Sequence, residues 1–137
     1  MRALLLLILV CLLSFVQGIS FIINVTGRVT CNDVPVPNHL VELWESDWGR
    51  GAPVNEDDKI TLHDSYTDEK GNYAVLGGDS EIGWAEPYVL VKANCTIVPN
   101  CKNGEKEHRF GKFFNFIPFS VEIFMYNYTD INFNICN

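Results

Sequence analysis

The alternation of side chains between Ile22 and Cys31 is the feature that most limits the fold of this chain. Apolar or small residues occupy every odd position from 23 to 31, and polar residues occupy the even positions from 24 to 30. A period of two places successive side chains on opposite faces of a strand. The pattern therefore predicts a half-buried β-strand whose odd-numbered side chains face a core.

Short segments rich in β-branched and aromatic residues follow, separated by glycine, proline and aspartate turn signals. Such segments are typical of strands, and no window shows the period of a long amphipathic helix. The polar or glycine-bearing segments 47–59 and 77–86 are expected to be loops. Seven or eight short strands predict an all-β sandwich, and after the first strand they are expected at 39–45, 60–67, 72–76, 87–95, 106–117, 120–128 and 131–135.

The first eighteen residues have the pattern of a secretory signal peptide. Arg2 supplies a positive charge, Leu4 to Leu13 form an apolar core, and Gly18 offers a small side chain at a cleavage point. The apolar run is shorter than the ~20 residues that a membrane-spanning helix needs. The sequence therefore predicts a signal peptide over 1–18, followed by a secreted, extracellular domain over 19–137 without a membrane span.

Cysteine usage agrees with an oxidising compartment. Of the five cysteines, Cys11 leaves with the predicted signal peptide, and four remain. An even number in a secreted chain predicts two disulfides, with three pairings open. We favour Cys95–Cys101 as a local closure, which leaves Cys31–Cys136. Because the spacings lack the paired C-x-x-C units of zinc sites, neither a metal nor a cofactor is predicted.

Three Asn-x-Thr sequons mark candidate N-glycosylation sites at Asn24, Asn94 and Asn127. The motif is short enough to occur by chance, and modification requires an accessible asparagine. Asn94 is the least favoured acceptor because it directly precedes Cys95, a predicted disulfide residue.

The net charge of −7 limits the classes of partner. An acidic chain has no electrostatic attraction for nucleic acid or for anionic membranes. The expected partner is an extracellular protein, a cell-surface component or a lipid, and the oligomeric state stays open.

No catalytic or metal-binding motif stands out. His39, His63 and His108 lie in separate segments, and the chain lacks a nucleophile elbow. The acidic residues Glu56 to Asp58 lack the ordered oxygen ligands and glycine of an EF-hand, which favours a solvated loop over a calcium site. The sequence therefore predicts a protein that is not an enzyme.

Two tryptophans are the candidate binding residues. Trp48 and Trp84 lie in polar segments that are predicted to be loops. Tryptophan is enriched among the residues that dominate binding energies. The phenylalanines between 110 and 119 are assigned to core packing instead.

Several short motifs follow one another along nearly the whole predicted mature chain. They are Val25-Thr-Gly-Arg-Val-Thr-Cys31, Val41-Glu-Leu-Trp-Glu45, Thr67-Asp68, Gly71-Asn-Tyr73, Gly77-Gly78 with Glu81, Pro87-Tyr-Val-Leu-Val91 with Cys95 and Cys101, Phe114-Asn-Phe-Ile-Pro118 and Asp130-Ile-Asn-Phe133. This ordered set resembles the nematode transthyretin-like family.

The resemblance implies a transthyretin-like (prealbumin-like) β-sandwich and a secreted, non-catalytic binding or signalling module. Carriage of a small apolar ligand is the alternative, supported by the 47% content of hydrophobic residues. A related activity, hydroxyisourate hydrolysis, needs converging histidine and arginine side chains and a C-terminal Tyr-Arg-Gly-Ser. Here the first strand has no histidine and the sequence ends in Asn132-Phe-Asn-Ile-Cys-Asn137, so the enzyme is the least favoured option.

Overall fold

The computed structural model describes residues 21–46, 57–80, 83–111, 113–115, 121–134 and 136. The predicted signal peptide and Trp48 lie outside the described residues. Within the described ranges, no helix has the length and apolar character needed to cross a membrane.

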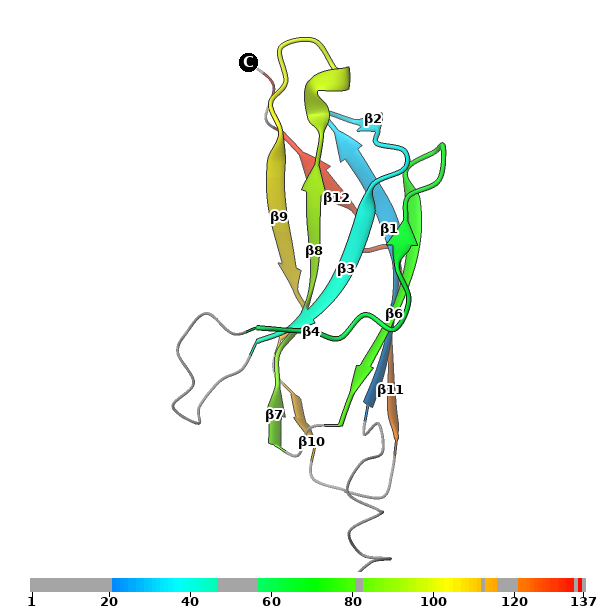
Figure 1. Cartoon of the computed structure of the whole chain (residues 1–137), viewed down its shortest axis with the longest axis vertical. Coiled ribbons are helices and arrows are strands. Elements are labelled where there is room, and N and C mark those ends of the chain that lie inside the picture. The colour runs from blue at the N-terminus through cyan, green and yellow to red at the C-terminus, as the bar shows by residue number, and fades with distance from the viewer. Residues whose placement is uncertain are drawn as a thin grey trace, which may run out of the picture.

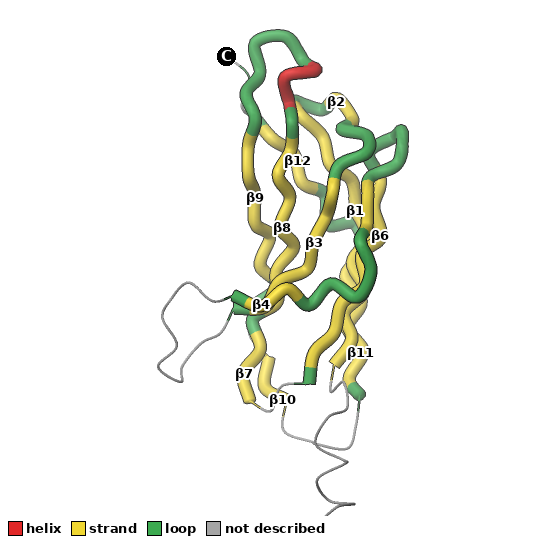
Figure 2. Tube along the Cα trace, in the orientation of Figure 1, coloured by secondary structure: helices red, strands yellow, loops and turns green. Residues whose placement is uncertain are grey.

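The described chain is built almost entirely from β-strands, with one turn of 3-10 helix among the described residues (Figure 2). In chain order the elements are β1 (Phe21–Cys31), β2 (Val34–Pro35), β3 (Leu40–Glu45), β4 (Asp58–Lys59), β5 (Ser65–Tyr66), β6 (Asn72–Asp79), β7 (Gly83–Ala85), β8 (Pro87–Ala93), η2 (Cys95–Ile97), β9 (Gly104–Arg109), β10 (Phe113–Asn115), β11 (Glu122–Tyr126) and β12 (Ile131–Phe133).

These strands form a two-layered sandwich, which confirms the predicted fold class (Figure 1). In the first sheet, β1 pairs antiparallel with β6 and β2, and parallel with β11 and then β12. The second sheet has the order β4-β3-β8-β9, with β5 beside β3. At one end, β7 and β10 form a separate two-stranded ribbon, and η2 lies at the opposite end (Figure 1).

The alternation in β1 has the predicted structural meaning. Its odd-numbered side chains, Phe21, Ile23 and Val25 among them, are fully buried between the sheets. They share one core with inward side chains of the second sheet, such as Leu43 and Val89. Burial of each large apolar side chain contributes roughly 1.5–3 kcal/mol relative to exposure. The even-numbered residues from Ile22 to Arg28 are half-buried or exposed and form part of the outer face of the first sheet, whereas Thr30 is buried.

A β-bulge separates β11 from β12. Val25 pairs with Tyr126 and Val29 pairs with Ile131, so four steps along β1 face five steps on the other strand. The extra residue is accommodated around Tyr128, which has a positive φ of 61°. The bulge lets β11 pair with residues 21–25 of β1 and β12 with residues 29–31, while the chain bends between them.

The bulge brings the carbonyl oxygen of Thr129 onto the middle of β1. A Cβ atom at Gly27 would lie 2.0 Å from this oxygen, so only glycine allows the approach. The buried hydroxyl of Tyr73 donates a hydrogen bond of 2.6 Å to the same oxygen. Burial, with a smaller effect from the charge of Asp130, raises the pKa of Tyr73 well above its usual range. Gly27 and Tyr73, which belong to two of the sequence motifs, thus both contact the Thr129 carbonyl.

The predicted strand over 60–67 is wrong in its middle. The structure has an isolated bridge between Thr61 and Gly77, and β5 covers only Ser65 and Tyr66. The hydroxyl of Thr61 accepts a hydrogen bond of 2.7 Å from the Leu43 amide and donates one of 3.0 Å to the Leu43 carbonyl. A side chain therefore replaces the backbone ladder that a continuous strand would make.

Other boundaries also differ from the prediction, and β4 occupies the last two residues of the predicted loop 47–59. The segment 77–86 is not one loop, because β6 continues to Asp79 and β7 begins at Gly83. The predicted strand 106–117 is divided into β9 and β10, and Gly111 between them has a positive φ of 91°. Glycine adopts this conformation without steric strain.

Candidate binding surfaces

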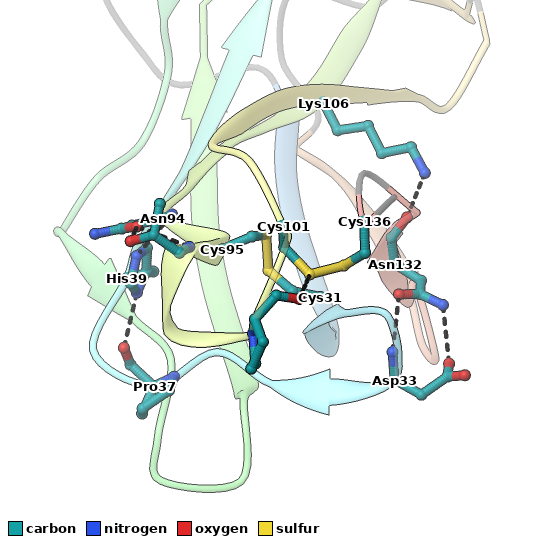
Figure 3. Close-up of a disulfide and its surroundings, with 12 residues drawn as sticks. Cys31, Asp33, Pro37, His39, Asn94, Cys95, Cys101, Lys106, Asn132 and Cys136 are labelled. Carbon is teal, nitrogen blue, oxygen red and sulfur yellow. Dashed lines mark hydrogen bonds between the residues drawn. A yellow bond between two sulfur atoms is a disulfide. The ribbon is translucent and has the colours of Figure 1, made fainter.

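Two disulfides join the layers at one end of the sandwich (Figure 3). Cys31 of β1 is bonded to Cys95, which follows β8, and their Cα atoms are 5.6 Å apart. Cys101 is bonded to Cys136. The number of disulfides is as predicted, but the favoured pairing of Cys95 with Cys101 and of Cys31 with Cys136 is wrong. We refer to this region, containing both disulfides, as the cystine end.

The 3-10 turn explains the pairing. Cys95 begins η2 and is fully buried, so its side chain meets the inward-facing Cys31 across the core. The turn then carries the chain toward the other layer, where Cys101 forms an isolated bridge with Cys136. The short sequence separation of Cys95 and Cys101 does not predict their pairing, because each of them is bonded to a cysteine of the other layer.

Hydrogen bonds reinforce the cystine end (Figure 3). The Lys106 ammonium donates to the carbonyl of Asn132 at 2.5 Å, and the Asn132 amide donates to Asp33 at 2.9 Å. His39 Nδ1 lies 2.7 Å from the carbonyl oxygen of Pro37. The backbone N–H of Asn94 donates a 3.0 Å hydrogen bond to His39 Nε2. The ring therefore links the segment between β2 and β3 to the residue that follows β8.

The histidines occupy three separate elements. His63 lies before β5, and the ring of His108 on β9 is 5.2 Å from that of Phe110. In the part of the chain that the structure describes, no group of three histidine, cysteine or acidic side chains could hold a metal ion.

Trp84 is placed on the two-stranded ribbon and is 59% exposed. It lies in β7 opposite Phe114 of β10, in a strand rather than in the predicted loop. The base of the ribbon is fixed to the core. Ala85 is fully buried, and the Glu86 amide donates a 3.1 Å hydrogen bond to the buried carboxylate of Glu45. We call β7, β10 and this base the ribbon end.

On the outer face of the second sheet, polar and charged side chains cover the apolar residues. Tyr88 and Leu90 are only 4% and 8% exposed although they point away from the core. The Arg109 guanidinium lies 4.7 Å from the centre of the Tyr88 ring, and the Tyr88 hydroxyl donates to Asp57 at 2.6 Å. Burial and this hydrogen bond raise the pKa of Tyr88. Long charged side chains thus shield this face.

An ion pair continues this cover along the same sheet. The Lys59 ammonium is 2.5 Å from the Glu42 carboxylate, and their hydrogen bond raises the pKa of Lys59. Trp44 also donates to Glu42 at 3.3 Å, so the aromatic ring is held within the polar network.

The outer face of the first sheet is different. Ile123 and Met125 are 68% and 63% exposed, Leu76 is also exposed, and Ile22 is half-buried. The strand register places these four side chains around Asn24. We call Ile22, Leu76, Ile123 and Met125 the outer-sheet patch. Contiguous exposed apolar side chains are candidates for contact with another molecule or group.

Two of the three sequons lie on this face. Asn24 is half-buried, Asn127 is exposed, and the hydroxyl of Thr26 donates a 3.3 Å hydrogen bond to the side-chain oxygen of Asn127. The exposed third sequon is at the cystine end, where the Asn94 side chain accepts a 3.1 Å bond from the Thr96 amide. Glycosylation at each of them stays a prediction.

Comparisons with known proteins agree with the resemblance seen in the sequence. A model of the Transthyretin-like family matches residues 26–108, from the second half of β1 to β9. Transthyretin-like protein 46 of Caenorhabditis elegans is 36% identical over 73 residues, which cover 53% of this chain. The match spans 37% of the length of that relative. The family match covers more than half of the chain, and the chain belongs to the transthyretin-like family.

Proposed function

We propose that this chain is a secreted, non-catalytic module that binds an extracellular protein through its ribbon end, with Trp84 as the central contact. Export is supported by the signal pattern in residues 1–18 and by two disulfides, which persist in oxidising compartments. A protein partner suits the acidic chain better than an anionic lipid surface.

The exposure of Trp84 is the observation that carries this proposal. A tryptophan with more than half of its surface in water is costly for a folded domain. Tryptophan is also the residue type most enriched among binding hot spots, where its large ring fills a pocket on the partner.

The support beneath Trp84 favours binding because the ribbon is held in place before a partner arrives. Ala85 anchors the strand in the core, and both backbone groups of Glu86 are hydrogen-bonded. Its amide donates to Glu45, and its carbonyl accepts from the Ser46 amide at 3.2 Å. A preformed contact loses less conformational entropy on binding than a flexible one.

A binding assay with the purified secreted protein tests the proposal. The protein is applied to intact cells and to the proteins of extracellular fluid, and a partner is identified by cross-linking. Trp84→Ala should weaken the measured affinity by about 30-fold or more, the effect expected of a hot spot worth about 2 kcal/mol. Trp84→Phe should retain part of the affinity because it keeps an aromatic ring.

Tyr66→Ala is the matched control. Tyr66 of β5 is an aromatic residue of similar exposure, 54%, on the second sheet. Its substitution should leave binding unchanged. Equal affinity of Trp84→Ala and the wild type would exclude the ribbon end as the contact. Failure of the wild-type protein to engage any protein or cell surface would exclude the binding function itself.

A further inference from the structure

We infer that an N-linked glycan on Asn24 covers the outer-sheet patch. Asn24 stands at the centre of that patch. Its direct neighbours across the sheet are Leu76 of β6 and Met125 of β11. One step along the same face, Ile22 lies beside Ile123. The glycan would therefore leave the protein from the middle of the exposed apolar side chains.

The chemistry of the cover fits this position. Pyranose rings have an apolar C–H face and a polar rim, so the first sugars can lie on methyl and thioether groups while their hydroxyls stay in water. An exposed apolar cluster is a liability for a monomeric soluble protein, and glycans are bulky and solubilising. The second sheet shields its outer face with Arg109 and Lys59. A sugar would provide the corresponding shield on the first sheet.

The same position protects a strand edge. Among the described residues, β11 is hydrogen-bonded only to β1, so β11 is the outermost described strand on that side. Open edges with apolar side chains invite pairing with other chains. Asn24 is one strand away from this edge, close enough for a branched sugar to obstruct it.

The neighbouring sequon marks this face as the glycan-bearing one. Asn127 follows β11, and its side chain accepts the hydrogen bond of Thr26, the residue that completes the Asn24 sequon. Asn127 lies beyond Met125 at the end of β11, so a glycan there would border the patch rather than cover it. This inference concerns another face than Trp84 and does not depend on the proposed binding function.

Methionine oxidation provides a direct readout of the cover. Met125 is the only methionine besides Met1, and Met1 precedes the predicted cleavage point. The protein is secreted from eukaryotic cells, site occupancy at Asn24 is measured by glycopeptide mass spectrometry, and the rate of Met125 sulfoxide formation in dilute peroxide is followed. Asn24 should be occupied, and enzymatic removal of the glycan from the folded protein should speed oxidation several-fold.

Matched variants separate the glycan from the asparagine itself. Asn24→Gln and Thr26→Ala each remove the sequon, and Thr26→Ala keeps Asn24, so both should oxidise as fast as the deglycosylated protein. Thr26→Ser keeps both the sequon and the hydroxyl and should behave like the wild type. Asn94→Gln removes a distant sequon and should also leave the oxidation rate unchanged.

Two results would overturn the inference. One is a secreted protein in which Asn24 is unmodified; light scattering would then show whether a second copy covers the patch instead. The other is an occupied Asn24 whose glycan leaves the oxidation rate of Met125 unaffected, which would mean that the sugar points away from the patch.

Discussion

The two ends of the sandwich are held together by different means. At the cystine end, Cys31–Cys95 and Cys101–Cys136 connect the layers covalently, and Lys106 adds a hydrogen bond across the same region. At the ribbon end, the strands are held by features that include the pairing of β7 with β10, the buried Ala85 and the hydrogen bonds of Glu86. We therefore expect the cystine end to contribute most to stability, while the exposed Trp84 lies at the ribbon end.

This separation has a practical meaning for mutations. Changes at the cystine end should lower the free energy of unfolding for the whole domain. Changes at the ribbon end should act more on binding than on folding. The following predictions test this division, beginning with the largest expected effect on stability.

Removal of the Cys31–Cys95 disulfide should have the largest effect. The bond closes a segment with a sequence separation of 64, and loss of its constraint on the unfolded chain costs about 4 kcal/mol in the chain-entropy model. Denaturant unfolding of the double variant Cys31→Ala/Cys95→Ala measures this loss. The Cys101→Ala/Cys136→Ala variant, with a separation of 35, should lose about half a kcal/mol less. A loss below about 1 kcal/mol for either pair would contradict the assignment of stability to this end.

Glu45→Ala should lower stability by about 1–3 kcal/mol, because the partly buried Glu86 amide would lose its acceptor. Glu45→Gln retains a side-chain oxygen and should lose less. Both variants should also bind the partner less tightly, since Glu45 supports the strand that carries Trp84. Wild-type stability of Glu45→Ala in thermal and denaturant unfolding would show that the ribbon is held by other contacts.

Alkaline pH should destabilise the middle of the first sheet. Burial raises the pKa of Tyr73, so the unfolded chain loses this proton first as the pH rises. The contribution of the neutral Tyr73 to the free energy of unfolding is therefore complete below about pH 10. It is lost above that pH, and the free energy of unfolding falls by about 1.4 kcal/mol per pH unit for one proton. Tyr73→Phe should reduce the slope of the free energy of unfolding against pH. A part of the slope should remain, because the pKa of Tyr88 is also raised.

At neutral pH the same Tyr73→Phe variant should lose about 0.5–1.5 kcal/mol, because the Thr129 carbonyl loses its hydrogen bond from the hydroxyl. An unchanged alkaline slope would show that the phenol ionises equally easily in both states.

Trp84→Ala should have the smallest effect on folding, within about 0.5 kcal/mol of the wild type, because the ring is mostly exposed. Its effect on partner binding should be large, as proposed above. Thermal unfolding and the binding assay on the same preparation compare the two quantities. A loss of more than about 1 kcal/mol would show that the ring also stabilises the domain and would break the division between the ends.

The architecture could be predicted because its main signals are local. The period-two pattern of β1 gives the strand, the buried face and the alternation directly, since each side chain's direction depends only on its position. The fold class follows from several such segments with turns between them, and the ordered motifs identify the family.

The remaining features depend on contacts between distant residues. The disulfide pairing is set by the 3-10 turn after Asn94, which directs Cys95 and Cys101 to different partners. The bulge at Tyr128 and the hydrogen bond between Thr26 and Asn127 depend on the alignment of β11 with β1. The outer-sheet patch was missed for the same reason. Its side chains come from three strands, although the exposed alternate positions of 121–125 carried a signal.

The parallel pairing of β1 with β11 sets an order of events during synthesis. Phe21 pairs with Glu122, so the first described strand cannot complete its sheet until residues 122–133 have left the ribosome. In an exported chain, Asn24 would pass the glycosylating enzymes while its neighbour in the finished sheet had not yet been made. A sugar could therefore be attached to a residue that later lies half-buried in a closed β-sheet.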